Sequence, residues 1–324
     1  MNKDKGIPSI GLVLSGGGAK GAYQAGIIKA LAEMDVPIAA ISGASIGALN
    51  GAVAAASDSL GDAAARLEKI WRATAEDPPL GDKIPTSIRL LEAVGLKLGD
   101  DFLYKTKIAN EIAHNLLPTI LSPETGALVD NSRIRGMLAE YVSVEQLARG
   151  TPLYVSVYPK NKKTLATLIG PGLAKLRIKK NRGAEFLHVQ SLHPEDQHTA
   201  LLASAAIPFL LAAQKIDGES YVDGGLGGIL SSSGNTPISP LLDAGCNPII
   251  VTHLSDRSAW NRQKHPDAAI IEIKREETIS RAPVLPEIFD VISFQPKKIN
   301  SWMKQGYNDT IRCVRPWLKF IVNR

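Results

Sequence analysis

Two stretches near the start of the chain decide the fold: IGLVLSGGGAKG at residues 10–21 and IAAISGASIG at residues 38–47. Each begins with an apolar run of strand length and continues through a glycine-rich turn into residues that are apolar at helical spacing. Alternation of strand and helix predicts a parallel sheet covered on both faces, that is, a three-layer α/β/α fold with a mostly parallel sheet. We expect strands at Ile10–Leu14 and Ile38–Ser42, and helices at Lys20–Met34 and Ile46–Ser57.

The rest of the chain continues the same pattern. We expect strands at Leu153–Tyr158, Thr164–Leu168, Phe186–Val189, Ser220–Val222 and Pro248–Leu254, and a helix at Thr199–Ala206. Proline-rich residues 77–131 predict a helical insertion, and residues 284–324 predict a helical C-terminal region. Neither a repeat nor a linker is evident, so we expect a single domain over residues 1–324 with its core at about 10–255.

Composition points to an ordinary globular protein, with 44% hydrophobic and 21% charged residues. The two cysteines, Cys246 and Cys313, imply no disulfide framework, and the first eight residues lack the apolar core of a signal peptide. Residues 37–57 carry no charge, but they are mostly Ala, Gly and Ser and hold Asn50, which favours a buried strand, turn and helix over a membrane span. We therefore expect a cytoplasmic protein.

The first glycine turn has two further interpretations that its neighbours disfavour. Gly16, Gly18 and Gly21 fit the dinucleotide pattern G-x-G-x-x-G, which needs an acid at the end of the second strand to hold the ribose. That strand ends at Ser42 and Gly43, without an acid. A P-loop would close with Gly-Lys-Ser or Gly-Lys-Thr, which is absent from this turn. We expect no nucleotide cofactor, and no metal.

The second turn, Gly43-Ala44-Ser45-Ile46-Gly47, carries the Gly-x-Ser-x-Gly pattern. In a nucleophile elbow, the flanking glycines let the backbone fold tightly enough to expose the serine hydroxyl. A serine in this place could instead simply cap the helix. The glycine-rich turn upstream favours catalysis, because its backbone amides could stabilise the oxyanion of an attacked ester.

A nucleophilic serine needs a base. The chain has six histidines and none lies in a glycine-framed turn, although His253, at the end of an expected strand, is the best placed. Asp223 is better framed, because it ends a strand and is followed by Gly224 and Gly225. An aspartate before glycines is also common in plain turns, so this motif alone would decide little.

The combination of motifs resembles the patatin-like phospholipase family. Three motifs occur in order, each after an expected strand: Gly-Gly-Gly-Ala-Lys-Gly (16–21), Gly-Ala-Ser-Ile-Gly (43–47) and Asp-Gly-Gly (223–225). The stretches Ala203–Pro208 and Asn235-x-Pro237-Ile238 are similar to that family as well. The resemblance covers roughly residues 10 to 255 and little of the insertion or the C-terminal region.

This resemblance implies a serine lipid acyl hydrolase, which cleaves fatty acyl esters of phospholipids, lysophospholipids or acylglycerols without a cofactor. It implies a Ser-Asp dyad, with Ser45 as nucleophile and Asp223 as base, and an acyl-enzyme intermediate. The implied oxyanion hole consists of the backbone amides of Gly16, Gly17 and Gly18. Lys20 stands where the family carries Arg or Lys, and the remaining motif residues are Gly21, Gly43, Gly47, Gly224 and Gly225. The alternatives are an acyltransferase or thioesterase with the same dyad, or a lipid-surface binding protein with a silent site.

Positive charge is concentrated at the end of the chain, where residues 297–324 hold seven basic residues and one acid, Asp309. Trp302, Trp317 and Phe320 lie among these charges, a pattern compatible with an anionic membrane surface. A solvated amphipathic helix with a packed inner face is the simpler alternative. Because no nucleic-acid-binding motif accompanies the charge, we expect no nucleic acid partner. Peripheral membrane contact through this basic region is the second hypothesis for it.

Overall fold

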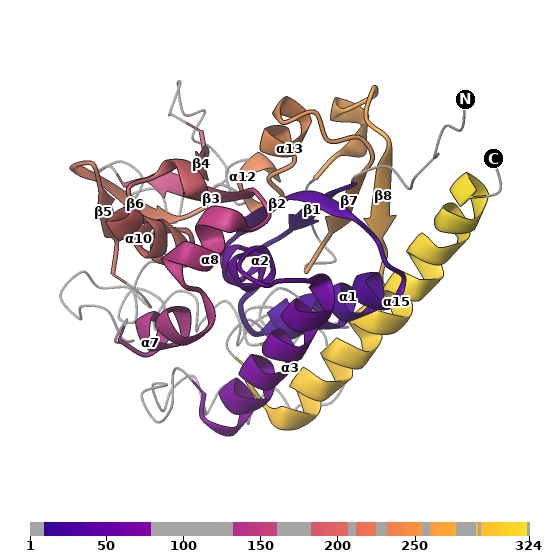
Figure 1. Ribbon diagram of the computed structural model, residues 1–324, viewed down its shortest axis with the longest axis horizontal. Coiled ribbons are helices and arrows are strands. Elements are labelled where there is room, and N and C mark those ends of the chain that lie inside the picture. The colour runs from indigo at the N-terminus through magenta and orange to yellow at the C-terminus, as the bar shows by residue number, and fades with distance from the viewer. Residues whose placement is uncertain are drawn as a thin grey trace, which may run out of the picture.

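The computed structural model describes residues 10–78, 132–160, 183–206, 212–224, 232–254, 260–276, 290 and 293–322. Its strands form one sheet: β1 (Ile10–Leu14), β2 (Ile38–Ala44), β3 (Leu153–Pro159), β4 (Glu185–His188), β5 (Gln214–Ile216), β6 (Glu219–Asp223), β7 (Ile249–Thr252) and β8 (Ile270–Ile273). Within the described residues the strand order is β5-β6-β3-β2-β1-β7-β8, and β4 also pairs with β3 (Figure 1).

The centre of this sheet is parallel. β1 pairs in parallel with β2 and with β7, β2 pairs in parallel with β3, and β7 does so with β8. The β4, β5 and β6 strands add antiparallel pairs at the β3 side. The predicted mostly parallel sheet is therefore confirmed. Its parallel strands end at the same edge, which is where ligands bind in open sheets of this kind.

Helices cover both faces of the sheet. Their bounds are α1 (Ala22–Glu33), α2 (Ile46–Ala55), α3 (Leu60–Glu76), α7 (Ser132–Tyr141), α8 (Val144–Arg149), α10 (Pro194–Ser204), α12 (Ser232–Asn235), α13 (Ser239–Asp243) and α15 (Pro296–Val322), with 3-10 turns η1 (Gly18–Gly21), η4 (Val189–Ser191) and η5 (Arg262–Lys264). Figure 1 shows α1, α2, α3 and α15 on one side of the central strands and α12 and α13 on the other. This arrangement confirms the three-layer α/β/α prediction.

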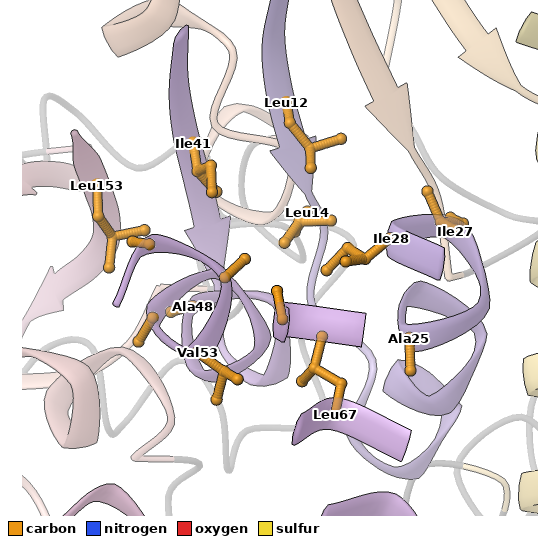
Figure 2. Packing of buried hydrophobic residues seen from close by; sticks show 14 of the residues in the cluster. Leu12, Leu14, Ala25, Ile27, Ile28, Ile41, Ala48, Val53, Leu67 and Leu153 are labelled. Carbon is orange, nitrogen blue, oxygen red and sulfur yellow. The ribbon is translucent and has the colours of Figure 1, made fainter. Parts of the chain in front are cut away.

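Most of the core lies between the sheet and the α1, α2 and α3 helices. Leu12, Leu14 and Ile41 point from β1 and β2 toward these helices, where Ile28 and Leu67 meet them (Figure 2). A smaller cluster under α13 fills the opposite face and includes Val13, Ile238, Leu241 and Val251. Alternate residues of β1 thus enter different layers, as the period of a strand requires.

The expected elements agree with the structure to within a few residues where it describes them. The largest differences are that α10 starts at Pro194 rather than Thr199, because Pro194 opens the helix, and that the C-terminal helix runs from Pro296 to Val322. The sequence analysis did not identify the helices α3, α7, α8, α12 and α13 or the strands β5 and β8. The strand expected at Thr164–Leu168, most of the insertion (79–131) and residues 284–289 lie outside the described residues.

The uncharged segment at residues 37–57 forms β2, a turn and α2, as predicted. Across the described residues, no helix combines the length and the apolar character needed to cross a membrane.

The longest helix, α15, crosses α1 with the two backbones in close contact. A Cβ at Gly26 would collide with the Met303 carbonyl, and a Cβ at Gly306 would collide with the Tyr23 carbonyl. Next to this crossing, the Tyr23 hydroxyl donates to Asp309 Oδ2 at 2.9 Å. Burial and the Asp309 charge raise the pKa of Tyr23 far above its ordinary value, so the phenol keeps its proton. Glycine contact and a buried hydrogen bond together fix α15 on α1.

We predict that Gly26→Ala and Gly306→Ala each lower the free energy of unfolding by about 1–3 kcal/mol, because the added methyl forces the two backbones apart. Gly136→Ala is the matched control: Gly136 is an exposed glycine inside α7 with nothing within 4 Å of its Cβ position. Alanine there should instead stabilise by up to ~1 kcal/mol through helix propensity. Urea unfolding measures all three, and equal effects at the three sites would contradict the close crossing.

Candidate active site

Ser45 forms the turn between β2 and α2 in a backbone conformation that serine rarely adopts. Its φ is 54° and its ψ is −125°, and backbone strain of this kind costs on the order of 1–3 kcal/mol. A capping serine has an extended backbone and accepts a hydrogen bond from the helix, whereas the Ser45 side chain makes no capping bond to α2. The geometry is therefore that of a nucleophile elbow and not that of a plain helix cap.

The two glycine-rich turns lie directly against each other. A Cβ at Gly47 would collide with backbone carbonyl oxygens at the end of β1. On the other side, a Cβ at Gly16 would lie 3.0 Å from Ser45 Cβ and 2.6 Å from Asn235 Oδ1. Because both positions are glycine, the turn after β1 can reach the serine that follows β2.

The last turn of α10 connects Ser45 to Asp223. The Ser45 backbone N–H donates to Ser204 Oγ at 3.1 Å, and the Ser204 hydroxyl donates to the Ser156 carbonyl at 2.6 Å. Two residues further on, the Ala206 carbonyl accepts the Asp223 N–H at 3.0 Å. These groups are all buried. One helix end thus holds the backbones of both predicted dyad residues.

Asp223 ends β6, which is separated from β2 by β3. Asp223 pairs with Val157, and Ala44, the residue before Ser45, pairs with the neighbouring Ser156. With neighbouring strands about 4.8 Å apart, the two strand ends are on the order of 10 Å apart. Directly paired residues point to the same face of a sheet. Asp223 therefore shares a face with Val157, whose side chain belongs to the core that α2 covers.

The turn after β1 offers backbone amides beside Ser45. The Gly16 N–H donates to the Asn235 carbonyl at 3.4 Å, whereas within the described part of the chain the Gly17 and Gly18 amides donate to no backbone carbonyl. Gly18 has φ 57°, a left-handed conformation that suits glycine and opens η1. Lys20 is buried in the same 3-10 turn. Of the three predicted donors, Gly17 and Gly18 thus have amides without a backbone acceptor in the described part of the chain.

The other motif residues lie in the same region. Gly21 closes η1, Gly43 lies in β2 and Gly224 directly follows β6, whereas Gly225 lies outside the described residues. In the described ranges, no group of three His, Cys, Asp or Glu side chains gathers where it could hold a metal ion.

His253, the best-placed histidine in the sequence, has other partners. It follows β7, and its Nε2 lies 3.8 Å from Glu272 Oε2 while its ring packs against Trp260 with centroids 5.3 Å apart. Burial, with Arg275 and Lys274 nearby, lowers the pKa of His253 to about 4. Among the described residues, no histidine is hydrogen-bonded to Ser45.

Sequence reasoning gave no role to Ser204 or Asn235, although both lie in stretches that it noted as family-like. Their partners are the Ser45 and Gly16 amides, which lie at least 159 positions away along the chain. A small-residue stretch at a helix end, followed by proline, was the available signal. It could not indicate which backbone groups such a stretch contacts.

Comparison with known proteins adds family evidence. The sequence profile described as patatin-like phospholipase matches residues 12–242. Over 45 residues the chain is 62% identical to lysophospholipase nte1 of Aspergillus terreus and 58% identical to neuropathy target esterase sws of Drosophila persimilis, covering 14% of this chain and 3% of each relative. The chain thus matches only a small part of these relatives. The solved structure of VipD from Legionella pneumophila aligns with a TM-score of 0.43 at 17% identity, covering 98% of this chain and 69% of VipD.

We predict that His253 makes stability depend on pH between about 6.5 and 4. An unfolded histidine takes up a proton near pH 6.5, whereas folded His253 does so only near 4. The unfolded state therefore binds more protons in this window, and the free energy of unfolding falls as the pH falls. Urea unfolding of the wild type and of His253→Gln should show a shallower acid loss in the variant. Parallel curves would contradict the prediction.

Proposed function

The chain belongs to the patatin-like phospholipase family, and from this premise we propose that it hydrolyses fatty acyl esters of lipids with Ser45 as the nucleophile and Asp223 as the base. The observation that supports the proposal best is the strained, uncapped Ser45 at the start of α2. Lysophospholipids and phospholipids are the proposed substrates, since the Aspergillus relative is named a lysophospholipase. The match to this relative spans only 45 residues and gives no information about the lipid head group. The proposal therefore names the bond that is cleaved, a fatty acyl ester, and no head-group preference.

In the proposed reaction, Asp223 accepts the hydroxyl proton of Ser45 as Oγ attacks the ester carbonyl. The open Gly17 and Gly18 amides donate to the oxyanion, and each such donor is worth on the order of 3 kcal/mol. The N-terminus of α2 adds positive potential at the same point. Asp223 then returns the proton to the leaving alcohol, and the acyl group remains on Ser45. Asp223 finally takes a proton from a water molecule that attacks the acyl carbon. The bond between this carbon and Ser45 Oγ breaks, the proton passes from Asp223 to Ser45 Oγ, and the fatty acid leaves.

Two alternatives use the same geometry differently. An acyltransferase or thioesterase would form the same acyl-enzyme, but it would pass the acyl group to an alcohol or accept it from a thioester. A lipid-binding protein with a silent site would not form it. Assays with alcohol acceptors and with acyl-thioesters distinguish an acyltransferase or thioesterase from a hydrolase. Labelling of Ser45 by a fluorophosphonate distinguishes an enzyme from a lipid-binding protein with a silent site.

We expect Ser45→Ala and Asp223→Asn each to lower hydrolysis of lysophospholipid and of a soluble ester by about a thousandfold or more. Fluorophosphonate should label the wild type, and Ser45→Ala should not react. Matched controls are Ser57→Ala, whose hydroxyl donates to Val53 within α2, and Asp217→Asn, an exposed aspartate in the β5–β6 turn. Both controls should keep wild-type rates. Hydrolysis retained by either dyad variant would remove that residue from the mechanism.

The proposed membrane contact is a row of cations along α15. Lys297, Lys304, Arg315 and Lys319 are exposed, and at 100° per residue they fall within about 60° of arc over roughly 33 Å of helix. None of the four forms an ion pair with another described residue. Phe320, 57% exposed, follows the last of them. Cations beside an exposed aromatic residue on one helix face suit an anionic lipid surface.

We expect Glu at these four positions to weaken binding to vesicles that contain anionic lipid by about a hundredfold or more, since each basic residue near such a surface contributes about 1 kcal/mol. The control carries the same change in net charge at Lys160, Lys215, Arg262 and Lys264, which are exposed elsewhere. Co-sedimentation should show loss only in the α15 variant, and wild-type binding should fall with salt. Equal loss in both variants would contradict a defined contact surface.

A further inference from the structure

A buried chain of side-chain amides runs from α3 through α2 and α1 to the loop that follows β1. The Trp71 Nε1–H donates to Asn50 Oδ1 at 3.1 Å, Asn50 Nδ2 donates to Gln24 Oε1 at 2.9 Å, and Gln24 Nε2 donates to the Ser15 carbonyl at 2.7 Å. Asn50 Nδ2 also donates to the Gly21 carbonyl at 3.0 Å. The three side chains are almost completely buried.

The two backbone acceptors of this chain are the two ends of one segment. Ser15 immediately precedes Gly16, and Gly21 closes η1, so the predicted donor amides of Gly17 and Gly18 lie between them. Ser15 is also fixed from the other side, because its hydroxyl donates to the Thr252 carbonyl at 2.6 Å. The loop is thus hydrogen-bonded at both ends, Ser15 and Gly21. These bonds restrict the movement of the Gly17 and Gly18 amides between them.

Asn50 lies on the same helix as the proposed nucleophile. Ser45 begins α2, and Asn50 follows five positions later in the same rigid helix. The first turn of α2 also touches both loop ends, because a Cβ at Gly47 would collide with the Ser15 carbonyl region and a Cβ at Gly21 would lie 2.5 Å from Ile46 Cγ1. Displacement of the loop relative to Ser45 therefore breaks either these contacts or the amide chain.

We infer that Asn50 and Gln24 are positioning residues, which set the distance between Ser45 and the backbone amides that stabilise the oxyanion. The inference rests on the proposed function for its catalytic meaning. A buried network in which each side-chain nitrogen and oxygen of Trp71, Asn50 and Gln24 is hydrogen-bonded is strong where water cannot compete, and leaving one partner unpaired is costly. Such a chain holds geometry better than glycine backbone alone, which lacks side-chain contacts. It acts on the transition state, because the oxyanion exists only there.

The experiment compares two variants. Gln24→Met removes the Nε2 donor to Ser15 and the Oε1 acceptor of Asn50 at nearly constant volume, and Asn50→Asp removes the Nδ2 group that donates to Gln24 and to the Gly21 carbonyl. Thr310→Val is the control, since it deletes a buried hydrogen bond to the Gly306 carbonyl within α15. On a soluble ester, kcat should fall by about 10–100-fold in both variants with KM nearly unchanged, and Thr310→Val should keep kcat.

A trifluoromethyl ketone reports the oxyanion site directly. Ser45 Oγ bonds to its carbonyl carbon, the hydroxyl proton passes to Asp223 and the ketone oxygen becomes the oxyanion.

The inhibitor should lose affinity by the same factor as kcat/KM, which a simple loss of stability would not cause. Wild-type kcat and inhibitor affinity in Gln24→Met and Asn50→Asp would overturn the inference. Hydrogen exchange of residues 15–21 gives a readout without activity: it should be faster in both variants and unchanged in Thr310→Val. If the wild type hydrolyses no ester, the proposed function fails by itself. The exchange result then decides the structural part, and unchanged exchange would overturn it.

Discussion

The site depends on one close approach, between the first turn of α2 and the end of β1. Gly47 touches the backbone carbonyls of Leu14 and Ser15, so any side chain larger than hydrogen would push the helix away from the strand. At this distance Gly16 also reaches Ser45. A nucleophile and a set of backbone donors from two different strand–helix units then meet at one edge of the sheet. Without this contact each turn would be an ordinary glycine-rich connection.

The strained conformation of Ser45 persists because several partners fix it. α2 is buried against the sheet on one side, and Ser204 accepts the Ser45 amide on the other. A buried N–H without an acceptor would cost about 1–3 kcal/mol, comparable to the strain itself. By accepting the Ser45 N–H, Ser204 therefore avoids the cost of an unpaired buried amide at a residue that already carries backbone strain. Because the carbonyl of Ala206, two residues after the end of α10, accepts the Asp223 amide, this segment relates the serine to the strand that carries the carboxylate.

The local features of this fold could be predicted from sequence, and the long-range ones could not. β1, β2 and α2 follow from apolar runs and glycine punctuation, so their bounds were predicted to within two residues. α3 was missed although Ser59 caps it and its apolar residues recur at helical spacing. The contacts of Ser204, Asn50 and Gln24 join residues far apart in the chain. A single sequence does not show which distant residues contact each other. In the sequence, a buried Asn or Gln also cannot be distinguished from one on the surface.

The same physical logic connects α15 to the site. Tyr23, next to Gln24 on α1, donates to the buried Asp309 of α15, while Gly306 presses against the α1 backbone. α1 in turn begins at the end of η1, the turn that carries the proposed donor amides. The cationic face of α15 is thus attached to the donor loop through a single rigid helix, without an intervening linker. A lipid surface bound by that face would meet the protein in one orientation relative to Ser45, since neither the crossing nor the loop can rotate independently.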